Sequence, residues 1–244
     1  MPESHSTNRN ESAIDPVSRS ATPESGLLAL ARWVSSLKTV PRTGWLDRGI
    51  DPVATESVAD HSFGVALLAW AAALERAAAG EIIDPGRVLM LALIHDLAEA
   101  ATGDVTPYDL ANTAIADDPE SRRAFFNRAH HRYAGNRAAR HAAEDAAIAV
   151  LLETSPAAFA STVRHLWSEL RAAQTAEARF VKQVDRLETF LQSRYYLESD
   201  PRLPVESFRH EVMETIDDAL LTSVRDRALT DAGPTSAMSA ENPE

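Results

Sequence analysis

The chain has 244 residues, of which 45% are hydrophobic and 25% are charged, as expected for one ordinary globular domain. Its net charge of −12 argues against a nucleic-acid polymer as a partner, because such binding usually rests on a basic surface. The absence of cysteine excludes disulfides, thiolate metal ligands and cysteine nucleophiles, so any metal must be held by nitrogen and oxygen.

The two ends of the sequence differ in composition from the part between them. Residues 1–25 and 230–244 are rich in small and polar residues with few large apolar ones, which predicts disordered tails. Residues 26–229 then form a single domain. No apolar run approaches the roughly 20 residues of a membrane span, and residues 1–25 lack the apolar core of a secretory signal. We therefore expect a cytoplasmic protein without a membrane partner.

Apolar residues recur at three- and four-residue spacing through most of this domain, which indicates amphipathic helices. The first predicted helix carries such a stripe at Leu27, Leu30, Trp33, Val34 and Leu37. Further helices are predicted, in chain order, over residues 57–79, 85–100, 120–133, 137–152, 156–173, 176–197 and 205–228. No stretch alternates with the two-residue period of a strand. The expected fold is therefore all-α, a bundle of helices in one domain.

Four polar residues lie close together near the end of the helix predicted over residues 85–100. His95 and Asp96 are adjacent, Glu99 follows within one turn, and Asp104 comes just after Gly103, where the helix should stop. These are metal-ligand and acid–base residue types. The alternative is a solvated helix end, but His95 directly follows an apolar run, which makes solvation a poorer explanation.

Two further residues complete a possible metal site. His61 opens the Ala-rich helix over residues 57–79, and Asp185 stands beside the apolar stripe of the helix over residues 176–197. Alone, His61 would be a core or capping residue, and Asp185 would pair with Lys182 or Arg186. Together with His95 and Asp96 they give two imidazoles and two carboxylates, a set that suits Mn²⁺, Co²⁺, Fe²⁺, Zn²⁺ or Mg²⁺.

The ordered H…HD…D pattern resembles the HD-domain phosphohydrolases, and within them the YfbR-like 5'-deoxynucleotidases. The matching segments are LKTVPRTGWLDRGI, ESVADHSFGVA, ALIHDLAEAATGDVTP and QTAEARFVKQVDRLETFLQ. The resemblance implies an HD-domain helical bundle and one divalent metal ion held by His61, His95, Asp96 and Asp185. It also implies removal of the 5'-phosphate from nucleoside monophosphates, with deoxynucleotides preferred. Relatives form dimers, so we expect a homodimer.

The same resemblance implies roles for residues around the metal. Glu99 would orient or activate the attacking water or manage protons at the leaving group. Arg42 would clamp the substrate phosphate, for which a planar guanidinium is well suited. Trp45 would line the nucleotide pocket, while Asp104 and Thr106 would contact the sugar edge.

Two other functions remain open at this point. A di-iron oxygenase of the HD type would need additional histidines, for which His130, His131, His141 and His165 are candidates; the alternative is that these are surface or ion-paired histidines. A non-catalytic nucleotide sensor would have no reason to retain Glu99. Arg48 is equally open between a second phosphate contact and a surface arginine.

Overall fold

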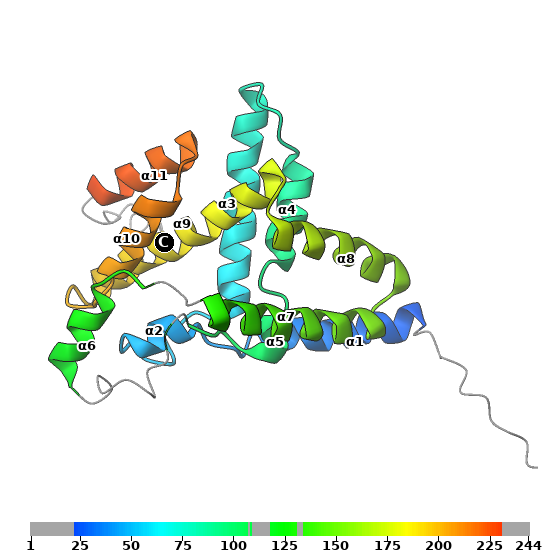
Figure 1. Cartoon of the computed structure of the whole chain (residues 1–244), viewed down its shortest axis with the longest axis horizontal. Coiled ribbons are helices and arrows are strands. Elements are labelled where there is room, and N and C mark those ends of the chain that lie inside the picture. The colour runs from blue at the N-terminus through cyan, green and yellow to red at the C-terminus, as the bar shows by residue number, and fades with distance from the viewer. Residues whose placement is uncertain (1–21, 107, 109–117, 131–133, 231–244) are drawn as a thin grey trace, which may run out of the picture.

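The computed structural model describes residues 22–106, 108, 118–130 and 134–230, and helices are the regular structure found in these ranges (Figure 1). The all-α prediction is confirmed. The helices are α1 (Pro23–Leu37), α2 (Thr43–Asp47), α3 (Val58–Ala78), α4 (Pro85–Ile94), α5 (Glu99–Thr102), α6 (Pro119–Phe126), α7 (Ala134–Thr154), α8 (Ala157–Ala172), α9 (Ala176–Ser199), α10 (Glu206–Thr215) and α11 (Ala219–Thr230). None of the helices described is long and apolar enough to cross a membrane.

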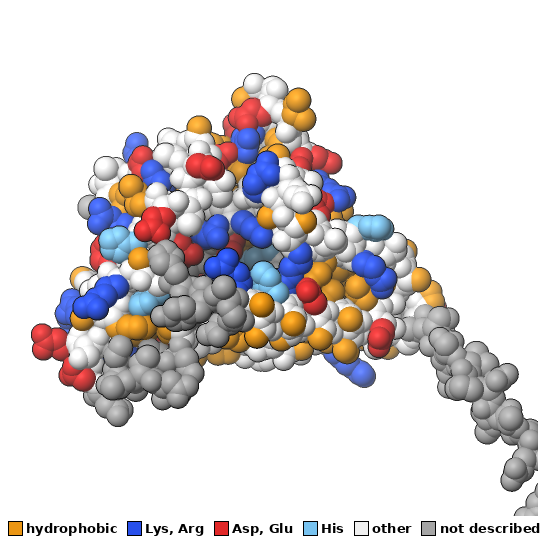
Figure 2. All heavy atoms as spheres, viewed as in Figure 1, with side chains coloured by type: hydrophobic (Ala, Val, Ile, Leu, Met, Phe, Trp, Pro, Cys, Tyr) orange, Lys and Arg blue, Asp and Glu red, His pale blue; other side chains and the backbone are white. Residues whose placement is uncertain are grey.

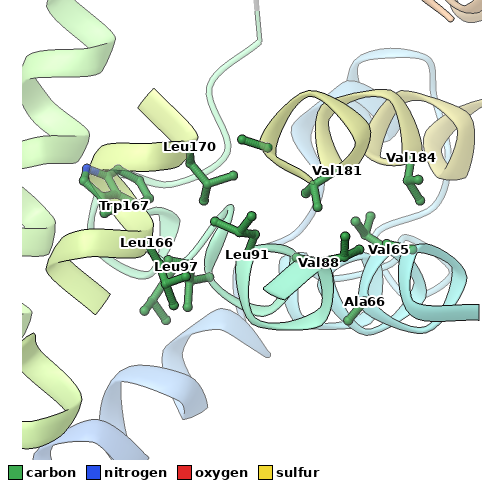
Figure 3. Close-up of a cluster of buried hydrophobic side chains, with 14 of the residues drawn as sticks. Val65, Ala66, Val88, Leu91, Leu97, Leu166, Trp167, Leu170, Val181 and Val184 are labelled. Carbon is green, nitrogen blue, oxygen red and sulfur yellow. The ribbon is translucent and has the colours of Figure 1, made fainter. Parts of the chain in front are cut away.

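The hydrophobic core lies where α3, α4 and α9 pack against one another, and α8 extends it (Figure 3). Small residues of α3, such as Ala69 and Ala73, are fully buried and allow the neighbouring helices to approach closely. Val88 and Leu91 of α4 and Val184 of α9 fill the space between them. This packing fixes the relative positions of the three segments that carry the predicted metal ligands.

The predicted helix over residues 85–100 is broken, and the break lies at the predicted site. Helix α4 ends at Ile94, a turn follows, and the short α5 begins at Glu99. Two side chains replace backbone hydrogen bonds that a continuous helix would make. The Trp33 Nε1–H donates to the Leu97 carbonyl at 2.7 Å, and His95 Nδ1 contacts the Ala92 carbonyl at 2.7 Å. The helix therefore stops without leaving these two carbonyl oxygens unpaired.

A second predicted helix, over residues 205–228, is also broken. Gln183 accepts hydrogen bonds from the backbone N–H groups of Asp217 and Asp218, between α10 and α11. The Asp218 carboxylate in turn caps α11 by accepting from the N–H groups of Leu220 and Leu221. These long-range contacts to α9 have no signature in the local periodicity.

Other differences concern the ends of the predicted elements. Helix α1 begins at Pro23, before the predicted start of the domain, and Leu27 and Val34 of its stripe are 59% and 41% exposed. Helix α2 was not predicted, and α6 ends at Phe126, short of the predicted end at residue 133. The predicted tails lie outside the described residues, except for residues 22–25 and 230.

Candidate metal centre and active site

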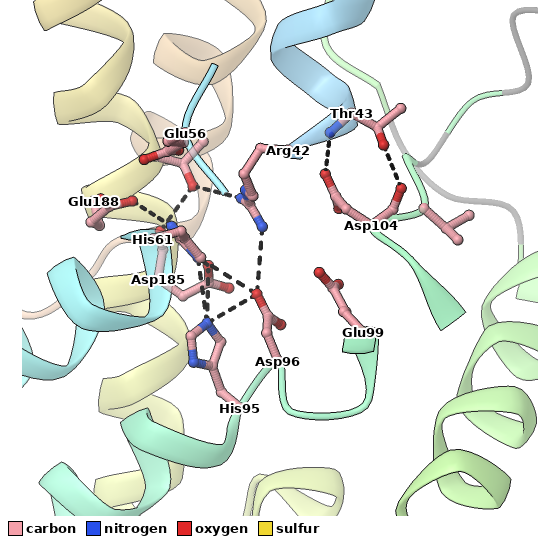
Figure 4. Close-up of polar contacts among 12 residues, drawn as sticks. Arg42, Thr43, Glu56, His61, His95, Asp96, Glu99, Asp104, Asp185 and Glu188 are labelled. Carbon is pink, nitrogen blue, oxygen red and sulfur yellow. Dashed lines mark hydrogen bonds and ion pairs between the residues drawn. The ribbon is translucent and has the colours of Figure 1, made fainter. Parts of the chain in front are cut away.

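Four candidate metal ligands meet at one point from three segments of the chain (Figure 4). His61 lies in the first turn of α3, held by a capping box between Ser57 and Asp60. Its Nε2 is 3.4 Å from His95 Nε2 and 3.1 Å from Asp185 Oδ1 of α9. The turn after α4 brings Asp96 Oδ2 to 3.2 Å from His95 Nε2 and 3.7 Å from His61 Nε2.

The spacing of these atoms fits a metal ion. Metal–ligand bonds of about 2.0–2.2 Å place neighbouring ligand atoms about 3.0–3.5 Å apart. His61 Nε2 has this spacing from His95 Nε2 and Asp185 Oδ1, whereas His95 Nε2 and Asp185 Oδ1 are 3.9 Å apart. Asp96 lies at the side of this group, where its Oδ2 also faces Arg42 Nη1 at 3.4 Å. The chemistry and the spacing of the donors therefore suit one divalent cation.

Both imidazoles are oriented by a partner on the ring nitrogen that points away from the site. His61 Nδ1 is 2.5 Å from Glu188 Oε2, and His95 Nδ1 is 2.7 Å from the Ala92 carbonyl oxygen. A carboxylate or carbonyl at Nδ1 takes the ring proton and leaves Nε2 as the ligand atom. Glu188 was missed by the sequence analysis. Its signal was available, because it lies three residues after Asp185 on the same helix.

The pKa shifts of His61, His95 and Asp96 show that the cluster favours positive charge on its imidazoles. Burial alone lowers the pKa of His95, but the neighbouring Asp96 carboxylate outweighs it and raises this pKa to about 9. Burial and Arg42 lower the pKa of His61, whereas its hydrogen bonds to Asp185 and Glu188 raise it to about 9. Burial raises the pKa of Asp96, but His95 and His61 bring it well below its usual range.

Arg42 and Glu99 border this cluster on the cavity side. Arg42 is the residue just before α2, and its Nη2 donates to Thr189 Oγ1 at 3.3 Å, one turn after Asp185 on α9. Glu99 is 1% exposed, and its Oε1 accepts a hydrogen bond from Arg140 Nη2 at 2.7 Å. Its Oε2 is buried and has no hydrogen-bond partner among the described residues.

The surroundings of Glu99 favour its neutral form when no cation is present. Burial, followed by the nearby carboxylates of Asp96 and Asp104, raises the pKa of Glu99 to about 10. The positive charges of Arg42 and Arg140 oppose this effect only in part. A buried carboxyl group with one oxygen fixed and the other unpaired is suited to exchange a proton or hold a water. No motif in the sequence marks Arg140 as the residue that fixes it.

Three predicted substrate residues lie on the same side of the cavity. Asp104 Oδ2 accepts from the backbone N–H of Thr43 at 2.7 Å, so the carboxylate caps α2 as well as facing the cavity. Trp45 is 2% exposed and donates its Nε1–H to Glu56, which leaves little of its ring to touch a ligand. The Thr106 hydroxyl donates to the Tyr108 carbonyl at 3.0 Å.

The surface alternative for Arg48 is wrong, because this residue is 7% exposed. Its guanidinium donates to Ser207 Oγ, the Pro204 carbonyl and the Gly44 carbonyl. The group also stacks over the rings of Phe126 and Phe208. Arg48 therefore connects α10 to α2 at the wall of the cavity.

The candidate ligands open into a cavity of about 700 Å³, a size typical of small-molecule sites. One wall carries Arg42 and Asp104, and the other carries basic residues of α7, α8 and α9. Figure 2 shows Lys and Arg side chains gathered near the middle of this face, with His beside them. The lining residues include seven Lys and Arg side chains and seven carboxylates, so the cavity is balanced in charge although the chain as a whole has a net charge of −12.

The additional histidines that lie within the described residues do not join the candidate metal ligands. His130 and His141 line the cavity, while His165 lies on α8 beside a separate shallow depression. Neither of the two groups of possible ligands within the described ranges includes any of the three. His131 lies outside the described residues.

Comparisons with known proteins agree with this architecture. The HD domain family model matches residues 34–222. A mouse protein named 5'-deoxynucleotidase HDDC2 is 32% identical over 72% of this chain and 73% of its own length. A Schizosaccharomyces pombe protein named 5'-deoxynucleotidase hdd1 is 29% identical over 67% of this chain and 68% of its own. A crystal structure described as a predicted metal-dependent phosphohydrolase, from Magnetospirillum magnetotacticum, is 26% identical with a TM-score of 0.53 and covers 86% of this chain and 94% of its own. The chain therefore belongs to the HD domain family.

Proposed function

We propose that this chain is a metal-dependent phosphohydrolase that removes the 5'-phosphate from nucleoside monophosphates and prefers deoxynucleotides. The observation that carries the proposal is the convergence of His61, His95 and Asp185 beside the half-buried Arg42 and the buried Glu99. The curated relatives named 5'-deoxynucleotidases support the same activity. The products would be the nucleoside and inorganic phosphate.

Membership of the HD family implies dependence on a divalent metal, and we propose that one ion is held by His61, His95, Asp96 and Asp185. When bound, such an ion supplies an acidified water and shields the negative charge of the phosphate. Mn²⁺, Co²⁺, Mg²⁺, Fe²⁺ and Zn²⁺ all suit the donor set. Glu188 orients His61 in this arrangement, as a carboxylate behind a ligating imidazole does.

Residues of the chain would bind the phosphate, position the water or proton, and contact the sugar. The Arg42 guanidinium faces the cluster from the side and would neutralise charge on the phosphate oxygens as it develops. Glu99, held through Oε1 by Arg140, would use its unpaired Oε2 to orient the attacking water or deliver a proton to the leaving oxygen. We place the sugar near Asp104 and Thr106, with Trp45 supporting the wall behind Arg42.

A phosphate-release screen over ribo- and deoxynucleotides with several divalent metals tests the proposal. We expect deoxynucleoside monophosphates to be hydrolysed faster than ribonucleotides and triphosphates. The variant Glu99→Ala should bind metal normally but lose about 100-fold or more in kcat. Full activity in that variant would remove Glu99 from the mechanism.

The same preparation distinguishes the two alternative functions. A nucleotide sensor would bind nucleoside monophosphates but release no phosphate with any metal. A di-iron oxygenase would contain two irons per chain and consume oxygen, whereas the present proposal expects one metal ion per chain. Metal analysis and an oxygen electrode therefore decide between the three functions.

We also propose that the chain forms a homodimer through α3. Phe63, Leu67, Trp70 and Leu74 lie on one face of this helix at three- and four-residue spacing and are 40–69% exposed. Light scattering should give twice the chain mass, and Leu67→Glu should give the monomer mass. The domain limits of 26–229 and a cytoplasmic location stay predictions.

A further inference from the structure

Lys182 is an unusual residue in this cavity. Lysine occurs in the chain only at positions 38 and 182, and arginine supplies the rest of the 24 basic residues. Lys182 lies on α9, three residues before Asp185, so it is one turn from the candidate metal site on the same side of the helix. It is half-buried and lines the cavity.

The guanidinium groups of Arg186 and Arg171 and the Asp185 carboxylate lie near Lys182, and no hydrogen bond or ion pair engages its ammonium among the residues that the structure describes. Burial, together with the nearby guanidinium groups of Arg186 and Arg171, lowers the pKa of Lys182. Arg171 and Lys182 likewise add to the effect of burial in lowering the pKa of His141. Such crowding of like charges destabilises the fold unless an anion neutralises it.

The neighbouring acids are already engaged by other cations. Arg171 pairs with Glu144 and Asp145, and Arg186 faces Glu211 at 3.4 Å. The negative charge of the Asp185 carboxylate opposes the positive charge of Lys182. A metal ion bound to Asp185 would neutralise that carboxylate. With the metal in place, the Lys182 ammonium would be a cation without an ion-pair partner among the residues that the structure describes.

The position of Lys182 separates it from the group that would hold the reacting phosphate. Arg42 contacts Thr189, one turn after Asp185, whereas Lys182 lies one turn before it. The two positions on α9 are seven residues apart, a rise of about 10.5 Å. A second phosphate bonded directly to the first would stay beside the metal. With the sugar placed near Asp104 and Thr106, a phosphate on its 3' oxygen would have to reach across the cavity to meet Lys182, which lines the same cavity.

We propose that Lys182, with Arg171, Arg186 and His141 around it, forms a second phosphate subsite in this cavity. Its ligand is a sugar phosphate of the substrate that is not linked to the reacting 5'-phosphate, so the chain accepts nucleoside 3',5'-bisphosphates. This inference rests on the proposed function for the identity of the reacting phosphate. The phosphate-release screen tests that function separately, so the subsite is tested by binding.

The experiment compares binding of a deoxynucleoside 3',5'-bisphosphate, the 5'-diphosphate and the 5'-monophosphate by calorimetry. The full chain carries Mn²⁺ and Glu99→Gln, so that bound nucleotide is not hydrolysed. We expect the bisphosphate to bind at least about tenfold more tightly than the monophosphate, the gain of one charge-assisted hydrogen bond. Lys182→Gln should remove this difference, and Lys38→Gln, which changes the exposed lysine at the end of α1, should retain it.

Three outcomes would overturn the subsite. Equal affinity for the bisphosphate and the monophosphate would show that no second phosphate is bound. An equal loss for both ligands in Lys182→Gln would place Lys182 at the reacting phosphate. A gain for the 5'-diphosphate as large as for the bisphosphate would place the second phosphate next to the first. Circular dichroism of both lysine variants confirms that they are folded.

Discussion

At the scale of single residues, the site depends on groups that hold the candidate ligands in position. His61 is completely buried, and the Glu188 carboxylate fixes which of its nitrogens faces the cluster. Arg140 does the same for Glu99 by taking one of its two carboxylate oxygens. Both partners come from positions that the motif itself does not mark. The motif supplies the reactive groups, and the packing around it determines their orientation.

Replacing Glu188 tests this orientation directly. Glu188→Gln keeps the size of the side chain but removes its charge, so it holds the proton on His61 Nδ1 less strongly. We expect the affinity for Mn²⁺ to fall by about 10- to 100-fold, as measured by calorimetry. Glu198→Gln, an exposed residue on the same helix, is the matched control and should bind metal as the wild type does. Equal affinity in both variants would contradict an orienting role.

The same two histidines predict a pH dependence of metal binding. Metal requires neutral imidazoles, but the pKa values of His61 and His95 are raised from 6.5 to about 9 in the folded chain. Affinity for Mn²⁺ should therefore rise between pH 6.5 and 9 and level off above pH 9, with protons released on binding. Calorimetry in buffers of different ionisation enthalpy measures both. A metal affinity that does not change from pH 7 to 9 would show that His61 and His95 carry no extra protons in the metal-free chain.

In the metal-free chain, the raised pKa values of His61 and His95 make the folded state less stable as the pH rises. A group whose pKa is raised on folding contributes stability below its unfolded pKa of about 6.5. This contribution disappears as the pH rises through the folded pKa of about 9. The metal-free chain should therefore become less stable toward unfolding by urea from pH 6.5 to 9.

At the scale of elements, the sequence predicted most helices but not where they break. The helix predicted over residues 57–79 matches α3 within one residue at each end, because amphipathic spacing is a local property. The breaks after Ile94 and Thr215 depend on Trp33 and Gln183, which are distant in the sequence. The break after Ile94 also explains how the adjacent His95 and Asp96 meet at one point, since a continuous helix would separate them by about 100°.

The contact between α3 and α9 predicts a strong dependence on one glycine. A Cβ atom at Gly64 would lie 2.7 Å from Glu188 Oε1, so Gly64→Ala must push the Glu188 side chain away from His61. We expect this change to destabilise the metal-free chain by about 1–3 kcal/mol in urea unfolding. In a Glu188→Ala background the same change should be neutral or stabilising, because alanine favours a helix. An equal cost in both backgrounds would place the strain elsewhere.

At the scale of the whole molecule, the candidate ligands connect the helices that form the core. They come from α3, from the turn after α4 and from α9, which pack together around Ala69, Val88 and Val184. The sequence predicted this site because its motif resembles a known family, since four separated residues cannot be brought together from periodicity alone. The cavity wall that carries Arg171 and Lys182 was not predicted, because these residues share a cavity only in the folded chain.

Because a metal at this site would bind the folded chain and not the unfolded one, it should stabilise the whole domain. At a free concentration 100 times its Kd, the gain is about 2.7 kcal/mol, or about 5–10 °C in Tm for a chain of this size. Thermal unfolding with Mn²⁺ and with EDTA measures this difference. Asp185→Asn should abolish it, whereas His165→Ala, which changes an exposed histidine of α8, should retain it. A Tm shift that survives in Asp185→Asn but is lost in His165→Ala would move the metal to α8 and contradict the site.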